Sequence, residues 1–382
     1  MSAETMGVEE EFLLIDPASG ATVPLAEKVV AGASAADLPV GATIQRELRD
    51  TQAEVATGIC VSAAELRTHL AGGRRVVAAA AREHGAVVVA SASPVRGSGG
   101  AVRSSLPRFA AIDDMYGEVT RDYEACGCHV HVGVADRDTA VAVVNHLGPW
   151  LPTLLALSVN SPFCHERDTG YGSWRIIQQS RFPGAGLAPY FRDHAAFRAE
   201  VGRLVECGVL ADEAQTFWLA RPSPRLPTVE LRAADTASTV DEAVLQALLG
   251  RALVDTALAD LDRGREATPV PQQVGAAAVW NAARYGLAGP GVHVGLARRM
   301  PATDLVAALL DHVRDALAHT GDVAEVHATI DRLRSGGTGA DRQRRIAGAG
   351  GLAAVVSQLT LWDETGGSGY PESVPPPEVS HG

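Results

Sequence analysis

The sequence is poor in cysteine and has more acidic than basic residues. Its five cysteines are odd in number and scattered, and Cys126 and Cys128 have no second pair to complete them, so neither a disulfide framework nor a zinc ribbon is predicted. The formal charge of −12 over 382 residues argues against a surface for nucleic acid or for an anionic membrane. An anionic substrate is not excluded, because a bound metal ion would set the local field.

Two further absences narrow the class of protein. The chain has no run of about 18 or more apolar residues and no basic, apolar leader, so we expect a cytoplasmic protein without a membrane partner. It has no Gly-x-x-x-x-Gly-Lys sequence, and no helix is expected after Gly97-Ser98-Gly99-Gly100. A P-loop or Rossmann nucleotide site is therefore not predicted.

The sequence predicts three strands that each have one polar and one apolar face. In residues 7–16, alternation places Glu9 and Glu11 on one face and Val8 and Phe12 on the other. Two such carboxylates would repel each other and lose hydration if buried, and a cation between them removes both costs. Oxygen ligands of this kind suit Mg²⁺ or Mn²⁺. For this motif alone, the alternative is a charged edge strand in water.

The second polar face lies in residues 128–134. His129, His131 and Gly133 share one side of this strand, and Gly133 leaves room above the backbone. A slip of one residue would bury both histidines, so the apolar side fixes the register. Imidazole is tolerated by Mg²⁺ among carboxylates and suits Mn²⁺ better. The alternative is a pair of satisfied core histidines.

The third polar face lies in residues 228–234, where Thr228, Glu230 and Arg232 share one side. Glu230 is a candidate metal ligand, and the guanidinium of Arg232 offers a bidentate fork to phosphate oxygens. Arg221 lies shortly upstream in a proline-rich entry to the strand. An ion pair on a solvated strand is the alternative for this stretch alone.

Taken together, the polar faces predict a metal cluster on the concave face of a curved antiparallel sheet. The expected ligands are Glu9, Glu11, Glu54, Glu230 and one of the two histidines, with Glu47 as a further candidate. Such a set would hold two or more divalent ions. Metal ions with arginines nearby are what phosphoryl transfer requires.

The order of elements favours an α+β fold with an antiparallel sheet, because strands come first and helices later. A capping box at the start of residues 62–84 predicts a helix there. Residues 161–190 carry much glycine and proline and are predicted to be an irregular lid, and residues 335–340 a flexible joint. We expect a single catalytic domain over residues 1–365 and a disordered tail over 366–382.

Several motifs follow one another in the order of a known family. They are Gly7–Phe12, Glu47-Leu48 with Gln52–Glu54, Cys128–Gly133, Leu157–Phe163, Asp168–Tyr171 with Arg175, Arg221–Ser223, Thr228–Arg232 and Asn281–Gly286. In this order the chain resembles the bacterial carboxylate–amine ligases of the glutamate–cysteine ligase type 2 family, over about residues 5–360.

This resemblance implies a glutamine-synthetase-like fold, in which a curved antiparallel sheet forms a funnel with helices packed on its outer face. It implies ATP-dependent γ-glutamyl–cysteine formation through an acyl phosphate, with release of ADP and phosphate. The implied cofactors are ATP and Mg²⁺ or Mn²⁺. The implied partners are an amino-acid carboxylate, an amine and a second copy of the chain in a homodimer.

The resemblance also implies roles for single residues. By position, the family's metal ligands correspond to Glu9, Glu11, Glu54, His131 and Glu230, with Glu47 as a further candidate. Arg232 would contact the transferred phosphate, with Thr228 beside it at the nucleotide. Arg175 and Arg221 would contact the carboxylate substrate or the acyl phosphate.

The chain departs from the family pattern near the expected substrate site. The unusual residues are Ser93, Cys164, Leu219-Ala220 and Leu226-Pro227. They spare the expected metal ligands, so the reaction type is better founded than the substrates. The alternatives are an ATP-dependent phosphotransferase on the same sheet, a non-catalytic nucleotide-binding homologue, and a metal-dependent hydrolase.

Overall fold

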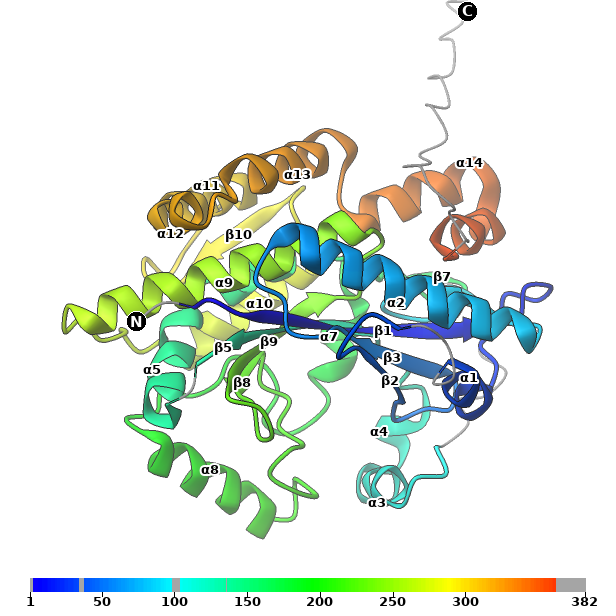
Figure 1. Ribbon diagram of the computed structural model, residues 1–382, viewed down its shortest axis with the longest axis horizontal. Helices are drawn as coiled ribbons and strands as arrows, with labels where there is room; N and C mark the ends of the chain where they lie inside the picture. The colour runs from blue at the N-terminus through cyan, green and yellow to red at the C-terminus, as the bar shows by residue number, and fades with distance from the viewer. Residues whose placement is uncertain (1–2, 34–37, 98–103, 135, 362–382) are drawn as a thin grey trace, which may run out of the picture.

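The computed structural model describes residues 3–33, 38–97, 104–134 and 136–361 (Figure 1). Seven strands form one sheet in the order β2-β3-β1-β5-β9-β8, with β4 paired to β1, and every pairing is antiparallel. The strands are β1 (Met6–Ile15), β2 (Thr43–Arg46), β3 (Gln52–Ala56), β4 (Val87–Val89), β5 (Gly127–Gly133), β8 (Ala220–Pro222) and β9 (Thr228–Asp235). Two hairpins lie outside this sheet, β6 (Phe163–Cys164) with β7 (Arg167–Asp168) and β10 (Pro290–His293) with β11 (Arg298–Pro301).

Helices cover the sheet unequally. α2 and α9 lie along one face, α11, α12 and α13 form a further layer beyond α9, and α3, α4 and α8 flank the other face (Figure 1). The helices are α1 (Ala26–Ala33), α2 (Ala63–Glu83), α3 (Pro107–Tyr116), α4 (Glu118–Arg121), α5 (Arg137–Leu147), α6 (Leu151–Ser158), α7 (Trp174–Gln179), α8 (His194–Glu206), α9 (Val240–Asp262), α10 (Gln272–Tyr285), α11 (Ala302–His312), α12 (Arg314–Thr320), α13 (Val323–Gly336) and α14 (Gly339–Leu359). The α+β class with an antiparallel sheet is confirmed. The funnel shape stays a prediction.

Helices α2 and α9 begin at hydroxyl caps, and α2 begins where the sequence predicts. At α2, the Ser62 hydroxyl accepts a hydrogen bond from the backbone N–H of Glu65, and α2 ends just before Gly85, whose φ is +74°. At α9, the Thr239 hydroxyl accepts from the backbone N–H of Glu242. These caps satisfy backbone groups that a helix end leaves unpaired.

The apolar sides of β1, β5 and β9 form the core under α9. Val8, Val130 and Leu231 are almost fully buried in one cluster with residues of α9. Gly250 lets α9 approach closely, because a Cβ there would lie 3.3 Å from Val130 Cγ1 and 3.4 Å from Leu231 Cδ2. This packing fixes the register of the strands, and it turns their polar residues to the opposite face.

One ion pair is buried on the helical side of the sheet. Glu10 is 1% exposed, and both of its carboxylate oxygens accept hydrogen bonds from Arg74 of α2. The same guanidinium donates to the carbonyl of Ala237. Removing either charge would leave the other buried and unpaired, at a cost of about 3–5 kcal/mol. This pair therefore anchors α2 on β1.

Residues 161–190 are more regular than the sequence predicts. They contain the β6–β7 hairpin and α7, and Arg175 of α7 is 1% exposed. The buried carboxylate of Asp235 accepts hydrogen bonds from the hydroxyls of Ser161 and Ser173. Composition alone suggested a loop here, because it does not show that β9 supplies a charged acceptor for this segment.

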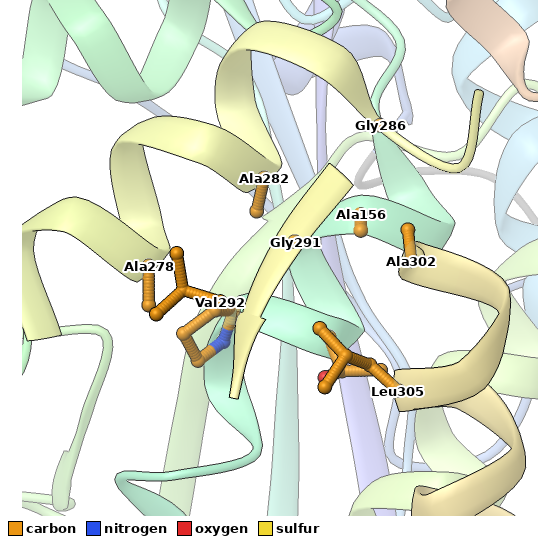
Figure 2. Close-up of a pocket in the computed structure, with 10 residues that line it drawn as sticks. Ala156, Ala278, Ala282, Gly286, Gly291, Val292, Ala302 and Leu305 are labelled. Carbon is orange, nitrogen blue, oxygen red and sulfur yellow. The ribbon is translucent and has the colours of Figure 1, made fainter. Parts of the chain in front are cut away.

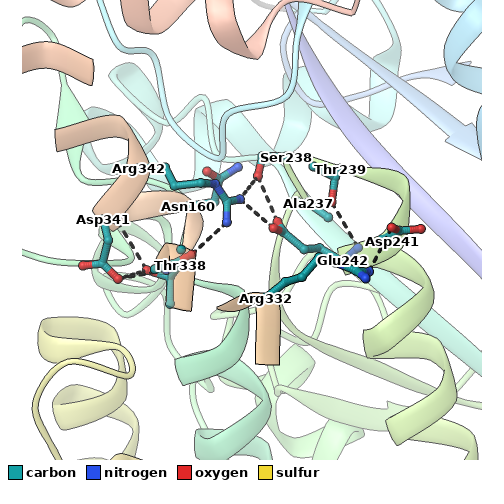
Figure 3. A network of polar contacts seen from close by, with 12 residues as sticks. Asn160, Ala237, Ser238, Thr239, Asp241, Glu242, Arg332, Thr338, Asp341 and Arg342 are labelled. Carbon is teal, nitrogen blue, oxygen red and sulfur yellow. Dashed lines mark hydrogen bonds and ion pairs between the residues drawn. The ribbon is translucent and has the colours of Figure 1, made fainter. Parts of the chain in front are cut away.

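The expected joint at residues 335–340 is instead a well-capped helix start. Thr338 caps α14, and its hydroxyl and backbone N–H both bond to the Asp341 carboxylate. Figure 3 shows the neighbouring network, in which Arg342 bonds to Glu242 of α9 at 2.6 Å and to the Ser238 hydroxyl. These contacts tie the C-terminal helices to the start of α9.

Two further expectations concern the end of the chain and membrane-spanning helices. Residues 366–382, where we expect a disordered tail, lie outside the described residues. Within the described ranges, no single helix is both long and apolar enough to cross a membrane, and α5 and α6 reach that length only as a pair bent by 66°.

Candidate functional site

The sheet brings the polar residues of five strands together. In the register of the strands, Glu11 of β1 lies opposite Glu54 of β3. His131 of β5 lies opposite Glu230 of β9, and Glu230 is opposite Arg221 of β8. Residues separated by more than 200 positions in the sequence thereby share one face, because antiparallel pairing places neighbouring side chains side by side.

One set of possible ligands combines an imidazole with two carboxylates. We call Glu9, His131 and Glu230 the histidine group; one potential ligand atom from each lies within 4.8 Å of the others. His131 Nδ1 lies 2.9 Å from the Thr228 hydroxyl. Its Nε2 is buried and lies 3.3 Å from Glu9 Oε1. This nitrogen has no partner among the described residues that meets hydrogen-bond geometry.

The second set consists of carboxylates only. We call Glu11, Glu47 and Glu54 the carboxylate group; one oxygen from each again lies within 4.8 Å of the others. The backbone N–H of Gly127 donates to Glu11 at 2.5 Å, and the amide of Gln45 donates to Glu54. Glu11 and Glu54 are buried, so water screens the repulsion between their carboxylates only weakly.

Burial and like charge together shift the pKa values of the carboxylate group. Burial, followed by the charge of Glu47, raises the pKa of Glu11 to about 8. Burial and the neighbouring carboxylates Glu9, Glu47 and Glu11 raise the pKa of Glu54 well above its ordinary value. Without a cation, Glu11 and Glu54 do not both ionise near neutral pH.

In the histidine group, arginines compensate the negative charge. Burial opposes ionisation of Glu230, but Arg221 and Arg232 outweigh it and hold the pKa of Glu230 well below its ordinary value. Arg221 Nε bonds to Glu230 Oε2 at 2.8 Å, and Arg232 Nη1 bonds to Oε1. For Glu9, burial is likewise outweighed, here by His129 and His131, so its pKa is lowered. For His131, burial is outweighed by Glu9 and Glu230, so its pKa is raised.

Arg221 has more local partners than the sequence indicates. Besides Glu230, it donates to the carbonyl of Ala214 at 2.7 Å and to the carbonyl and hydroxyl of Thr216. Its expected contact with the carboxylate substrate stays a prediction. In the structure, its fork holds Glu230 in place on β9.

His129 lies between the two groups. Its Nδ1 is 3.4 Å from Glu9 Oε2, and its Nε2 is 3.8 Å from Glu11 Oε1. Arg232 Nη1 is 3.5 Å from His129 Nδ1. Burial, with Arg232 adding to it, lowers the pKa of His129 to about 4, so its ring is neutral at pH 7. Sequence alternation places both histidines on this face, and the residue-by-residue resemblance selected only His131.

Arg175 reaches the same face from α7. Its Nη2 donates to the carbonyl of Arg232 at 3.1 Å, and its Nη1 lies 3.8 Å from Asp235. A Cβ at Gly127 would lie 2.5 Å from Arg175 Nη2 and 2.9 Å from His129 Nε2. The sequence motif around Gly127 gave no sign of this, because the requirement comes from α7. Contact of Arg175 with a substrate stays a prediction.

The departures from the family pattern occupy ordinary structural positions. Ser93 is fully buried, and its hydroxyl donates to the Phe163 carbonyl at 2.7 Å. Cys164 and Leu219 are buried, whereas Leu226 is 47% exposed. None of these side chains belongs to either ligand group in the described part of the chain.

An apolar pocket lies away from this face (Figure 2). Residues of α6, α10, β10 and α11 line it, including Ala156, Ala282, Val292 and Leu305. Its lining contains no charged side chain. It therefore offers nothing for a metal ion or a phosphate, and the candidate site remains on the sheet.

The donor chemistry of the sheet face fits hard divalent cations. The histidine group has a buried imidazole nitrogen without a hydrogen-bond partner in the described residues. The carboxylate group has buried oxygens whose repulsion a cation would relieve. Oxygen ligands with a single imidazole suit Mg²⁺ or Mn²⁺, as predicted from the sequence.

Solved structures with the same fold include two ligases. The chain matches the glutamate–cysteine ligase of Francisella tularensis in complex with AMP with a TM-score of 0.67 and 14% identity, over 94% of this chain and 88% of that one. It matches the Pup ligase PafA in complex with Pup with a TM-score of 0.55 and 13% identity, over 94% and 73%. At these identities the likeness is one of fold.

Relatives found by sequence share a much higher identity with this chain than these solved structures do. A Saccharopolyspora erythraea protein provisionally named glutamate–cysteine ligase 2-2 is 53% identical over 93% of this chain and 91% of its own length. A Salinispora tropica protein provisionally named glutamate–cysteine ligase 2 is 43% identical over 93% and 94%. The model of glutamate–cysteine ligase family 2 (GCS2) matches residues 5–358. The chain therefore belongs to glutamate–cysteine ligase family 2.

Proposed function

We propose that this protein is an ATP-dependent carboxylate–amine ligase. The observation that carries the proposal is that two groups of potential cation ligands lie on one sheet face with Arg221 and Arg232. Membership of glutamate–cysteine ligase family 2 supports the reaction type. The likeness in fold to a ligase solved in complex with AMP supports a nucleotide site.

The proposed reaction has two steps. A carboxylate oxygen of the acid attacks the γ-phosphorus of ATP, the bond to the β-phosphate oxygen breaks, and ADP leaves. The nitrogen of the amine then attacks the acyl carbon, phosphate leaves with the former carboxylate oxygen, and the nitrogen loses a proton. The product is an amide, and ATP supplies the driving force.

The residues of the sheet have separate tasks in this scheme. The histidine group and the carboxylate group hold Mg²⁺ or Mn²⁺, which neutralises phosphate charge when bound. Arg232 contacts the transferred phosphoryl group, because its fork suits phosphate oxygens. Arg175 and Arg221 orient the acid substrate. A preorganised set of charges of this kind stabilises the transition state without reorganising during the reaction.

The finer parts of the proposal come from the family. We propose glutamate as the acid and cysteine as the amine, which corresponds to the EC 6.3.2.2 class. We further propose a funnel-shaped sheet in one catalytic domain over residues 1–365, a cytoplasmic location and a homodimer. The departures at Ser93, Cys164, Leu219-Ala220 and Leu226-Pro227 make the substrates the part that most needs testing.

The test is ADP release with a panel of amino-acid carboxylates crossed with amines, in Mg²⁺ and in Mn²⁺, followed by product mass. The proposal predicts ADP release that needs both substrates and an amide product with the mass of acid plus amine minus water. A stable phosphorylated acid with no need for amine would indicate a phosphotransferase. Turnover without ATP would indicate a hydrolase, and nucleotide binding without turnover a non-catalytic homologue; each result would contradict the ligase.

A further inference from the structure

Thr228 makes a contact that the proposed reaction leaves unexplained. The family resemblance places this residue at the nucleotide, but its hydroxyl oxygen lies 2.9 Å from His131 Nδ1. An imidazole binds a metal ion through an unprotonated nitrogen, and the hydrogen bond of the other nitrogen decides which one that is. The contact therefore bears on how the histidine group binds a cation.

The sheet holds the backbone of Thr228 from both sides. Thr228 is paired with Gly133 of β5, and its carbonyl accepts a hydrogen bond from the Ser223 N–H at 2.9 Å. Gly133 is itself closely packed, because a Cβ there would lie 2.3 Å from Thr5 Oγ1. The hydroxyl is thus presented from a strand with little freedom, which is the setting that a precise site requires.

The other nitrogen of His131 is turned toward the carboxylates. Nε2 lies 3.3 Å from Glu9 Oε1 and is buried without a hydrogen-bond partner in the described residues. Glu230 completes the group, with one ligand atom from each of the three residues inside 4.8 Å. Apart from this 3.3 Å contact with a carboxylate, Nε2 has no partner in the described residues, and a buried polar atom is seldom left so poorly bonded without a ligand or ordered water.

We propose that Thr228 is a positioning residue for the cation of the histidine group. Its hydroxyl oxygen accepts a hydrogen bond from the Nδ1–H of His131, which leaves the Nε2 lone pair free and directed between Glu9 and Glu230. Thr228 acts through His131 and does not contact the cation. This inference rests on the proposed metal-dependent function, and it concerns cation affinity.

The test compares variants that keep or remove the hydroxyl. Thr228→Val keeps the branched shape without the hydroxyl, and Thr228→Ser keeps the hydroxyl. Thr22→Val is the matched control, because Thr22 is buried and its hydroxyl has no hydrogen-bond partner in the described residues. Binding of Mn²⁺ alone, without nucleotide, is followed by the electron paramagnetic resonance of free Mn²⁺. Nitrogen modulation in the spin echo reports imidazole bound to Mn²⁺.

We expect Thr228→Val to weaken Mn²⁺ binding about 10- to 100-fold and to lose nitrogen modulation, as removal of a ligand-orienting partner does. Thr228→Ser restores both readouts, and Thr22→Val changes neither. If Thr228→Val binds Mn²⁺ with wild-type affinity and modulation, the inference is wrong and the ligase proposal stands. If the wild-type protein itself binds no Mn²⁺, the metal-dependent function fails and this inference with it. Should Thr228→Val not fold, Thr228→Ala serves as the variant without a hydroxyl.

Discussion

The two ligand groups lie on the same sheet face, yet their charges are handled in opposite ways. In the histidine group, Glu230 is paired with Arg221 at 2.8 Å and with Arg232, and its pKa is lowered. In the carboxylate group, Glu11 is surrounded by like charge and burial, and its pKa is raised to about 8. One group is charge-balanced by the protein, whereas burial and like charge oppose ionisation in the other.

Because of this difference, the two groups are expected to affect folding stability in different ways. The histidine group is held in place by side-chain contacts before any cation binds, so removal of one of its charges would leave the others buried and unpaired. The carboxylate group stores repulsion, so binding of a cation there stabilises the folded chain. Variants in the two groups should therefore agree in their effect on activity and differ in their effect on stability.

The largest effect is expected for Glu230→Gln. It removes a proposed metal ligand and leaves Arg221 and Arg232 buried without their carboxylate. We expect ADP release to fall by at least about 100-fold, since metal charge contributes several kcal/mol to such a transition state. The free energy of unfolding should fall by about 3 kcal/mol, as when one partner of a buried ion pair is lost. Enzyme assays and urea unfolding measure the two quantities. Wild-type stability would contradict the charge-balance account.

Glu54→Gln should have a similar effect on activity and the opposite effect on stability. The loss of a carboxylate ligand lowers ADP release by about 100-fold. Without metal at pH 8, the free energy of unfolding should rise by about 1 kcal/mol, because the cost of keeping this buried carboxyl un-ionised beside other carboxylates is removed. Glu83→Gln, on the exposed end of α2, is the control and changes neither quantity. A fall in metal-free stability would remove the distinction between the two groups.

Arg232→Lys tests whether the balance of the histidine group needs the guanidinium fork. Arg232 bonds to Glu230 and lies 3.5 Å from His129 Nδ1, and an ammonium group cannot meet both positions and a phosphate oxygen at once. We expect ADP release to fall about 10- to 100-fold while the protein stays folded. Thermal unfolding checks the fold. Wild-type kinetics would refute the role given to Arg232.

Stability without metal should depend on pH. The pKa of Glu11 is raised to about 8 on folding and that of Glu54 is raised as well, so their contribution is complete below about pH 4.5 and is lost as the pH rises through 8. The pKa values of Glu9 and Glu230 are lowered, so their contribution is present above about pH 4.5 and is lost at lower pH. The lowered pKa of His129 adds a contribution that is complete above about pH 6.5 and is lost as the pH falls toward 4, so it offsets part of the carboxylate effect in weak acid.

Metal-free protein should therefore be most stable in weak acid and lose about 1 kcal/mol per pH unit toward pH 8. Saturating Mg²⁺ should remove this loss, because a cation favours the ionised carboxylates. Urea unfolding between pH 5 and 9, with and without Mg²⁺, measures both slopes. If the free energy of unfolding without metal does not change with pH, the account of the carboxylate group is wrong.

The polar faces of the main strands could be predicted from the sequence because alternation is a local property. Glu9 and Glu11 on β1, and His129 and His131 on β5, needed only the period of two and an apolar backing. The capping residues Ser62 and Thr239 also act within one turn of their helix. Such features depend on neighbours in the sequence.

What the sequence did not reveal depends on partners from distant segments. The region before β5 gave no sign of α3 and α4, which Arg49 anchors by bonding to Asp113 at 2.9 Å. The contacts of the Arg221 fork with Glu230 and with residues 214–216 could not be predicted either, because they require β8 to pair with β9. The contact of Thr228 with His131 requires the register of β5 against β9, which no single motif encodes.

The most direct test of the account is a crystal structure of the protein with Mn²⁺ and ADP, with the ions located by anomalous scattering. The account predicts one manganese peak bounded by Glu9, His131 and Glu230, and another bounded by Glu11, Glu47 and Glu54. Manganese bound elsewhere, with both of these positions lacking a peak, would contradict it.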